Sequence, residues 1–317
     1  MKLRKKLFLS CAALAACAAT LVSTTYAWYT SNSVVSASGI QGTTATSGSD
    51  LLLISDTGTA GTWSNSVTVA DANAKATAMN PVEYTAVSGA QGTLKSWGGK
   101  GVSTNAAAAG ADYIEFDIFV KASAQKDVYI EALTITNTTS TLPSKQILAT
   151  AGGLAQTGTT TTYTVDALRT LQIEVLKETY VDAIKTTTTV DLLDPEGIIT
   201  FKDDSIGTLG INATGENTKF NAHEYLNEVT GNTIAVDSEG TTGKKLSTTE
   251  GSNYVLCTTP VGQDVAKESY VKLTFRAYLN GWDWACFDAC QGQTFTIAMT
   301  LTCDTTGKSV LKVPASV

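Results

Sequence analysis

The chain of 317 residues has one histidine, His223, and this scarcity excludes most catalytic sites that depend on imidazole. A His-Glu-x-x-His zinc site needs a second histidine after Glu224, but Asn227 stands at that position. A Ser/His/Asp triad would have to use His223 itself, and the chain contains no Gly-x-Ser-x-Gly segment leading into a helix. The sequence therefore predicts no catalytic residues, and we expect the protein not to be an enzyme.

Charged residues are also scarce, at 16% of the chain, and the basic ones form no patch that could neutralise phosphates. The formal net charge is −7 at pH 7, so we expect no binding to nucleic acid. Some carboxylates lie close together but lack the Asp-x-Asp-x-Asp-Gly spacing of a calcium loop; they are Asp191, Asp194, Glu196, Asp203 and Asp204. The sequence therefore predicts no metal ion and no cofactor.

The N-terminus has the pattern of a bacterial export signal. A group of basic residues is followed by an apolar stretch from Leu7 to Val22, and the stretch from Thr25 to Ala27 offers the small side chains that signal peptidase requires. We therefore expect residues 1–27 to be removed and the protein to be secreted. Their removal takes away four basic and no acidic residues, which changes the formal net charge to −11 and favours solubility.

A second interpretation of the leader stays open, because Leu14-Ala15-Ala16-Cys17 fits the lipobox that directs lipid to a cysteine. Against it, the apolar run continues to Val22, where a lipoprotein normally begins a polar tether. Lipidation of Cys17 would anchor the protein at the cell surface. Otherwise we expect it to be free of the membrane, because no apolar stretch near the C-terminus is long enough to span a bilayer and the last residues contain no LPxTG-like sorting motif.

The residues around the cleavage site carry a family resemblance. The run Tyr26-Ala27-Trp28-Tyr29-Thr30, leading into Ala37-Ser38-Gly39-Ile40, resembles the N-terminus of the TasA/camelysin family, secreted proteins of Gram-positive bacteria that build biofilm-matrix fibres. The resemblance covers the leader and extends loosely to the strand pattern and to a C-terminal segment around Trp282. It implies a subunit that polymerises head to tail with copies of itself, the freed N-terminus of one subunit completing a sheet of the next. Camelysin is classed as a metallopeptidase, but this chain lacks the histidines for such a site.

Residues 28–49 are the expected donor segment. No charged residue occurs in it, so it can enter a sheet without burying an ion. An extended peptide satisfies its own backbone groups together with those of an exposed sheet edge, and a head-to-tail contact that does not close makes a filament. The residues expected to carry the contact are Trp28, Tyr29, Val34, Val35 and Ile40.

The remainder, residues 50–317, is expected to be one all-β domain. Alternation of apolar and polar residues, and short apolar runs between turn residues, indicate strands. The expected strands are 51–54, 62–70, 114–120, 128–136, 254–257, 271–279 and 295–301. Residues 168–180 fit either a strand or a helix. Many short strands between Gly- and Thr-rich turns favour a jelly-roll-like antiparallel β-sandwich.

Two parts of this domain are expected to differ from the strands. Residues 181–251 are rich in Thr, Asn, Asp and Gly, which predicts long inserted loops that either have no special role or set partner choice and the lateral packing of fibres. A short helix is predicted from Asp283, as N-cap, to Gly292. The aromatic side chains of Trp282, Trp284 and Phe287 are interpreted as a plug for one end of the sandwich, with stacking on sugar rings as the alternative.

The cysteines beyond the leader are Cys257, Cys286, Cys290 and Cys303. An even number in an exported chain suggests disulfides, with three possible pairings. Cys303 continues the apolar face of the last strand and Cys257 ends a strand that we interpret as its neighbour, so we expect a Cys257–Cys303 bridge. Cys286 and Cys290 lie on one face of the expected helix with nearly parallel Cβ vectors, which disfavours a bridge between them. A zinc site made of all four cysteines is the alternative, although structural zinc prefers tighter paired spacings.

These patterns predict a secreted structural subunit of an extracellular fibre or a biofilm matrix. Its main partner would be a copy of itself, and a matrix accessory protein or a polysaccharide could also bind. The alternative is a monomeric secreted or lipid-anchored surface protein that uses its inserted loops to bind a polysaccharide or a host ligand.

Overall fold

In the computed structural model, the described residues are 36–37, 41–45, 52–59, 62–68, 79–96, 105–122, 124–137, 140–150, 153–165, 167–195, 210–211, 217–218, 243–260, 269–281 and 294–314. Within these ranges the chain is mostly β-structure, arranged in mixed and antiparallel sheets with one short 3-10 turn, η1 (Ala167–Thr170).

The largest sheet has eight strands. Its main path runs through β15 (Lys244–Lys245), β12 (Ile184–Asp194), β11 (Leu171–Val181), β18 (Tyr270–Asn280), β5 (Pro81–Val87) and β6 (Ala90–Ser96). Strand β18 also pairs with β7 (Ile114–Ala122), which in turn pairs with β3 (Leu52–Ser55). Because β18 has β11 on one side and β7 on the other, it lies at the centre of this sheet.

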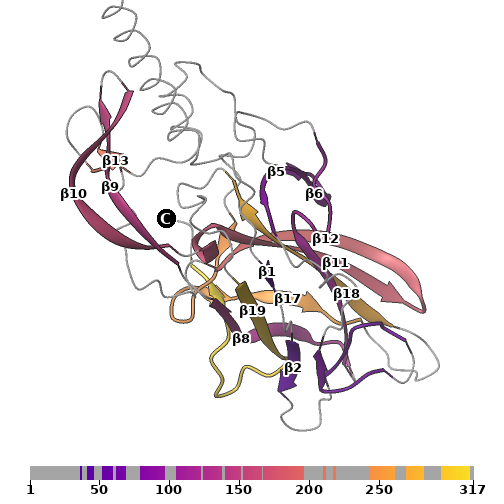
Figure 1. Ribbon diagram of the computed structural model, residues 1–317. Helices are drawn as coiled ribbons and strands as arrows, with labels where there is room; N and C mark the ends of the chain where they lie inside the picture. Colours follow the sequence, from indigo (N-terminus) through magenta and orange to yellow (C-terminus); the bar gives the residue numbers. More distant parts are fainter. Residues whose placement is uncertain are drawn as a thin grey trace, which may run out of the picture.

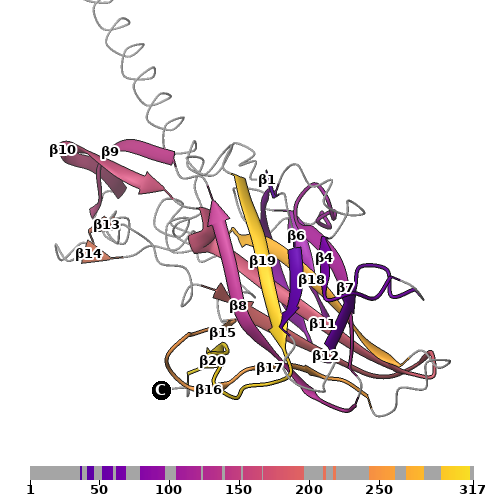
Figure 2. The ribbon, with the colours of Figure 1, turned by 90° about the horizontal axis from the view of Figure 1, so that it is seen from below.

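The second sheet has six strands. They are β17 (Val255–Thr258), β8 (Asp127–Asn137), β19 (Thr294–Thr302), β2 (Gln41–Ala45) and β4 (Ser66–Thr68), with β1 (Ser36–Ala37) also beside β19. This sheet lies below the large sheet in Figure 1, and the view from below in Figure 2 shows β8 and β19 in front of β11 and β18. The two main sheets therefore form two layers.

The buried side chains of these two layers form one hydrophobic cluster. Ile118, Val175 and Phe275 of the large sheet belong to it together with Ile130 and Leu301 of the second sheet. Along β7 every second residue is buried, which is the result expected where successive side chains point to opposite faces of a strand. The period-two pattern of the sequence thus places the core between the layers.

Two smaller sheets occur in the described chain. One contains β10 (Gly153–Val165), β9 (Ser140–Thr150), β13 (Gly210–Ile211) and β14 (Asn217–Thr218), and the other pairs β16 (Ser252–Asn253) with β20 (Lys312–Val313). The β9–β10 hairpin lies apart from the two main layers in both Figure 1 and Figure 2.

Each expected strand segment contains a strand of the structure, and the ambiguous segment 168–180 is mostly strand β11. The sheets differ from the expectation in being mixed, because β1 and β2 both run parallel to β19. Strand β12 occupies the first part of the segment 181–251, where loops were expected. The helix expected between Asp283 and Gly292 lies outside the described residues.

Candidate functional site

The N-terminal segment runs along β19 as two short strands. Strand β1 lies opposite residues 294–295 and strand β2 opposite residues 298–302, both in parallel orientation. The other side of β19 is paired with β8, and β2 is itself paired with β4. The backbone of β1 and β2 therefore occupies the edge of β19 that β8 leaves open.

The predicted donor residues Trp28, Tyr29, Val34, Val35 and Ile40 lie outside the described residues. The two strands β1 and β2 lie within the predicted donor segment and have strand conformation. They pair within their own chain, so the structure shows this segment as part of its own subunit's sheet.

The cysteines are placed differently from the prediction. Cys257 lies opposite Val128 of β8, and on the other side of β8 Tyr129 lies opposite Thr302, which precedes Cys303. A whole strand separates the two cysteines, and two strand spacings of about 4.8 Å each exceed the reach of a disulfide. No disulfide joins these two described residues, so the prediction of a Cys257–Cys303 bridge is wrong. Cys286 and Cys290 lie outside the described residues.

The thiol of Cys257 belongs to the core. It is buried among the apolar residues of the main cluster. Burial raises the pKa of this thiol to about 12. Because the thiolate is the reactive form, Cys257 should be inert to oxidation and alkylation in the folded chain.

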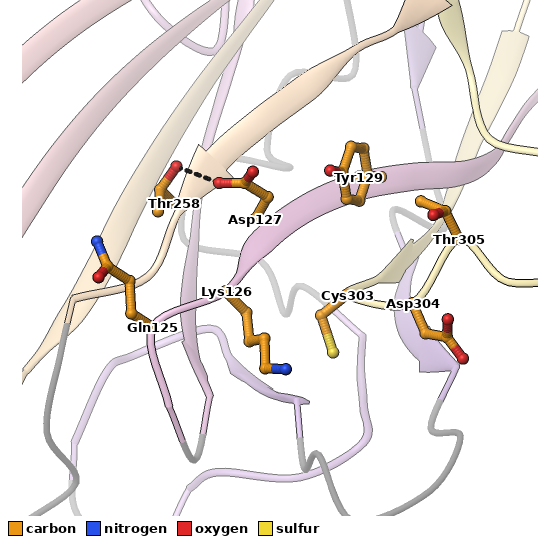
Figure 3. Close-up of a pocket in the computed structure, with 8 residues that line it drawn as sticks. All are labelled: Gln125, Lys126, Asp127, Tyr129, Thr258, Cys303, Asp304 and Thr305. Carbon is orange, nitrogen blue, oxygen red and sulfur yellow. Dashed lines mark hydrogen bonds between the residues drawn. The ribbon is translucent and has the colours of Figure 1, made fainter.

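Cys303 borders a polar pocket of about 460 Å³, shown in Figure 3. The pocket is lined by Gln125, Lys126, Asp127, Tyr129, Thr258, Cys303, Asp304 and Thr305. The hydroxyl of Thr258 donates a hydrogen bond to Asp127 Oδ1 at 2.7 Å, and the carboxylate of Asp304 lies well apart from this pair in Figure 3. The charged groups do not converge on one point, so we assign no ligand to the pocket.

A buried polar cluster joins the β5–β6 hairpin to β11 and β18 of the same sheet. The side chain of Glu174 is fully buried, and its carboxylate accepts hydrogen bonds from Tyr84 OH at 3.1 Å and Gly92 N–H at 2.6 Å. Arg276 pairs with Glu115 at 2.7 Å and with Glu174 at 3.5 Å. Burial raises the pKa of Glu174, an effect that the Gly92 N–H and Arg276 oppose. The cluster holds the hairpin to the sheet.

Asp191, one of the carboxylates considered for calcium, is held by donors of its own chain. Its carboxylate accepts hydrogen bonds from Lys177 Nζ at 2.5 Å, from Tyr254 OH at 2.8 Å and from Lys244 Nζ. Burial acts to raise the pKa of Asp191, but the hydrogen bonds from Lys177 and Lys244 lower it below its usual value. This carboxylate therefore neutralises lysines, and they occupy the space that a cation would need.

This ion cluster should make stability depend on pH. The folded-state pKa of Asp191 is lower than its ordinary value of 3.8, so the ionised carboxylate stabilises the fold above that pH. The stabilisation is lost as the pH falls through the folded-state pKa. Asp191→Asn should therefore lower the free energy of unfolding at about pH 7, and this loss should shrink as the pH falls below about 3.8, measured by urea unfolding across that range. Glu250→Gln, which removes an exposed carboxylate, is the control; a pH-independent deficit for Asp191→Asn would contradict the prediction.

Sequence reasoning missed an aromatic cluster on the large sheet. The ring centroid of Tyr270 lies 4.9 Å from that of Tyr180, 5.6 Å from that of Phe119 and 6.2 Å from that of Trp63. The ammonium of Lys121 lies 4.3 Å from the Trp63 ring centroid. These residues come from segments far apart in the sequence, so no local pattern could have shown them. Because the rings pack on one another, we interpret them as a small hydrophobic cluster that stabilises the fold, and not as a flat surface on which sugar rings could stack.

Among the described residues, no group of three or more His, Cys, Asp or Glu side chains could hold a metal ion. The same part of the chain contains no helix that is long and apolar enough to cross a membrane. Asp194, also considered for calcium, ends β12 opposite Lys245 of β15. The remaining residues considered for chemistry lie outside the described ranges; they are His223, Glu196, Asp203, Asp204, Trp282, Trp284 and Phe287.

A scan against protein-family models, a search of curated proteins and a search of solved structures found no match to this chain.

Proposed function

We propose that this protein is a secreted structural subunit of an extracellular fibre or a biofilm matrix, as the resemblance to the TasA/camelysin family implies. The subunit is a jelly-roll-like sandwich that polymerises by donation of its N-terminal strand. One observation supports this proposal above others: β1 and β2 already lie along β19 in a parallel register. A strand that pairs within its own chain can be exchanged for the same strand of another copy without new contact chemistry.

The exchange has a simple physical basis. When β1 and β2 are withdrawn, the backbone N–H and C=O groups along that edge of β19 lose their partners and must be hydrated. The same segment of a second copy restores those hydrogen bonds in the same register. Each subunit then gives its N-terminus to one neighbour and receives that of another, so the contact does not close and a filament grows.

In this proposal signal peptidase creates the donor by exposing the segment that begins at Trp28. The protein acts outside the cell, in the matrix or at the surface, and needs neither a catalytic residue nor a cofactor. Its principal partner is another copy of itself, while an accessory matrix protein or a polysaccharide could join the fibre. If Cys17 is lipidated, cleavage occurs before the donor segment and leaves it tethered.

Truncation provides the direct test. The mature chain beginning at Trp28 should form filaments in electron micrographs, whereas a chain beginning at Ser47, which lacks β1 and β2, should stay a folded monomer. A synthetic peptide of residues 28–46, added at about 100 times its Kd, should then raise the Tm of the truncated chain by roughly 5–10 °C. Filaments from the truncated chain would refute strand donation.

A point variant tests the same contact in the full mature chain. Thr43 of β2 has Thr300 on one side and Ser66 on the other. Thr43→Pro therefore removes a ladder hydrogen bond whichever neighbour its N–H faces, and should prevent assembly. Ser47→Pro lies beyond the end of β2 and should assemble normally. Dispersed particles from the unmodified mature chain would favour a monomeric secreted or lipid-anchored binding protein instead.

A further inference from the structure

The outer edge of β12 is a second place where a strand can add. Strand β12 pairs with β11 over nearly its whole length, but β15 pairs with its other edge only at Leu193 and Asp194. Within the described ranges, no strand pairs with that edge between Ile184 and Leu192. In Figure 1, the hairpin of β11 and β12 extends to the right, away from β5 and β6 of the same sheet.

The pairing at the end of β12 shows which backbone groups face this edge. The N–H of Leu246 donates to the carbonyl of Asp194 at 3.1 Å, so the backbone groups of Asp194 face away from β11. Both groups of a strand residue face one side, and successive residues alternate. Thr188, Val190 and Leu192 therefore direct their N–H and C=O groups outward, while Thr189 directs its own toward β11.

The usual protections of an edge strand are missing from the stretch 187–190. Natural edges carry charged side chains, proline or bulges that discourage the addition of another strand. This stretch consists of three threonines and Val190, without charge or proline, and β-branched residues of this kind favour strands. One bulge occurs at Thr186, near the hairpin tip, which leaves residues 187–190 regular.

The charged residues beside this stretch are engaged within their own chain. Lys185 bonds to Glu178 at 2.9 Å, and the carboxylate of Asp191 is held by Lys177 and Lys244. The Asp191 carboxylate is thus held by its own chain, and Lys185 lies beyond the bulge, outside the regular stretch. Lys185 and Asp191 also lie at opposite ends of the stretch and carry opposite charges.

We propose that β12 pairs in antiparallel orientation with β12 of a second copy, about a twofold axis at Thr188. Thr188 then lies opposite the second copy's Thr188, and Thr187 lies opposite the second copy's Thr189, so the paired residues belong to the regular part of the strand. The outward groups of Thr188 gain hydrogen-bond partners from protein in place of water. This contact goes beyond strand donation, because it joins subunits sideways and does not use the N-terminus.

The absence of charge and the repeated threonines make a second copy a suitable occupant. After removal of residues 1–27 the formal net charge is −11, so contact between two copies is least opposed at a surface without charge. The stretch 187–190 is such a surface, and about this axis its threonines lie opposite threonines of the second copy. Cross-strand pairs of β-branched and hydroxyl side chains are favourable, and the axis places no like charges opposite each other.

Cross-linking through an introduced cysteine tests both the pairing and its register in the full mature protein. Thr188→Cys places two thiols on the axis, where the Cα atoms of a hydrogen-bonded pair lie about 5.5 Å apart, within reach of a disulfide. Mild oxidation should give a dimer whose peptide map contains a 188–188 link. Ile184→Cys is the matched control, because Ile184 is 68% exposed on the same strand but lies far from the axis. We expect its 184–184 link to form at least about tenfold less.

Two further substitutions test the contact without new disulfide chemistry. Thr188→Pro removes an outward N–H and no bond to β11, so it should abolish the sideways dimer in light scattering while leaving Tm nearly unchanged. Thr189→Pro removes a bond to β11 and should lower Tm. Thr188→Lys places like charges on the axis and should also abolish the dimer, whereas Ile184→Lys adds the same charge outside the paired stretch and should not.

The outcomes separate this inference from the proposed function. A missing 188–188 link in folded Thr188→Cys, or a dimer that persists in both Thr188→Pro and Thr188→Lys, would overturn the inference. If hydrogen-exchange protection of residues 188–192 disappears in Thr43→Pro, the N-terminal segment is what pairs with the edge of β12. That result would also overturn the inference. Filaments without the link would reject only the sideways pairing, and the link without filaments would reject only strand donation.

Discussion

Replacing Phe275 by alanine should lower the free energy of unfolding by about 3–5 kcal/mol. Phe275 lies on β18 and is 3% exposed, and its ring stacks on Phe116 with centroids 5.0 Å and planes 10° apart. The substitution removes this ring contact and leaves a cavity between the layers. Because β18 is hydrogen-bonded to β11 on one side and to β7 on the other, its backbone cannot move inward to fill that cavity.

Denaturant unfolding of the mature chain measures this loss. The m-value should stay constant while the midpoint falls, because the variant changes stability and not the surface exposed on unfolding. Phe275→Leu refills part of the cavity and should cost less, and Thr187→Ala, at an exposed position on β12, should stay within about 0.5 kcal/mol of the unchanged protein. A loss below about 1 kcal/mol for Phe275→Ala would contradict a core shared by the two layers.

The strands of the core could be predicted because burial on one face leaves a period of two in the sequence. β7 shows this, with alternate residues buried from Ile114 to Ala122. Residues 168–180 could not be resolved locally, since Leu168, Leu171 and Val175 also share a helix face. Their pairing with β18, which is distant in the sequence, decides for the strand. Propensity is weak beside such long-range pairing.

Strand β12 was missed for a different reason. A two-residue hairpin turn is recognised from Asn-Gly or Asp-Gly, because both central residues need a positive φ. Here Asp182 and Ala183 take φ values of 52° and 65°, and alanine gives no such signal. The threonines that follow therefore stand without a local hairpin signal, although β-branched residues favour strands once a partner such as β11 is present.

The order of strands within a sheet was also beyond the sequence. Cys257 and Cys303 were expected on neighbouring strands, but β8 lies between those strands. Alternation shows which face a residue takes and not which strand stands beside it. The same limit hid the pairing of β1 and β2 with β19, and the meeting of Glu174 with Arg276, which are 102 positions apart.

Replacing Glu174 by alanine should be the other large loss, about 3–5 kcal/mol, because it breaks a buried, hydrogen-bonded charge pair. The substitution leaves the Gly92 N–H and the Tyr84 hydroxyl without their acceptor, and Arg276 keeps the Glu115 carboxylate and the Gly92 carbonyl as partners. Gly92 lies directly against the Tyr84 ring, since a Cβ at that position would lie 2.2 Å from it. The two donors are therefore held close together beside position 174.

A matched surface pair and a double variant separate charge pairing from packing. Glu131→Ala breaks the partly exposed ion pair with Lys308, at 3.3 Å, and should cost only about 0–1 kcal/mol. Glu174→Leu combined with Arg276→Met should cost less than the sum of the single variants by about 1–3 kcal/mol, because the double change leaves no buried charge at position 174 or 276 without its partner. Equal losses for Glu174→Ala and Glu131→Ala in urea unfolding would show that Glu174 is not a buried anchor. Additive losses in the cycle would instead mean that Arg276 is stabilised through Glu115 alone, and that the hairpin is held by the hydrogen bonds of Tyr84 and Gly92.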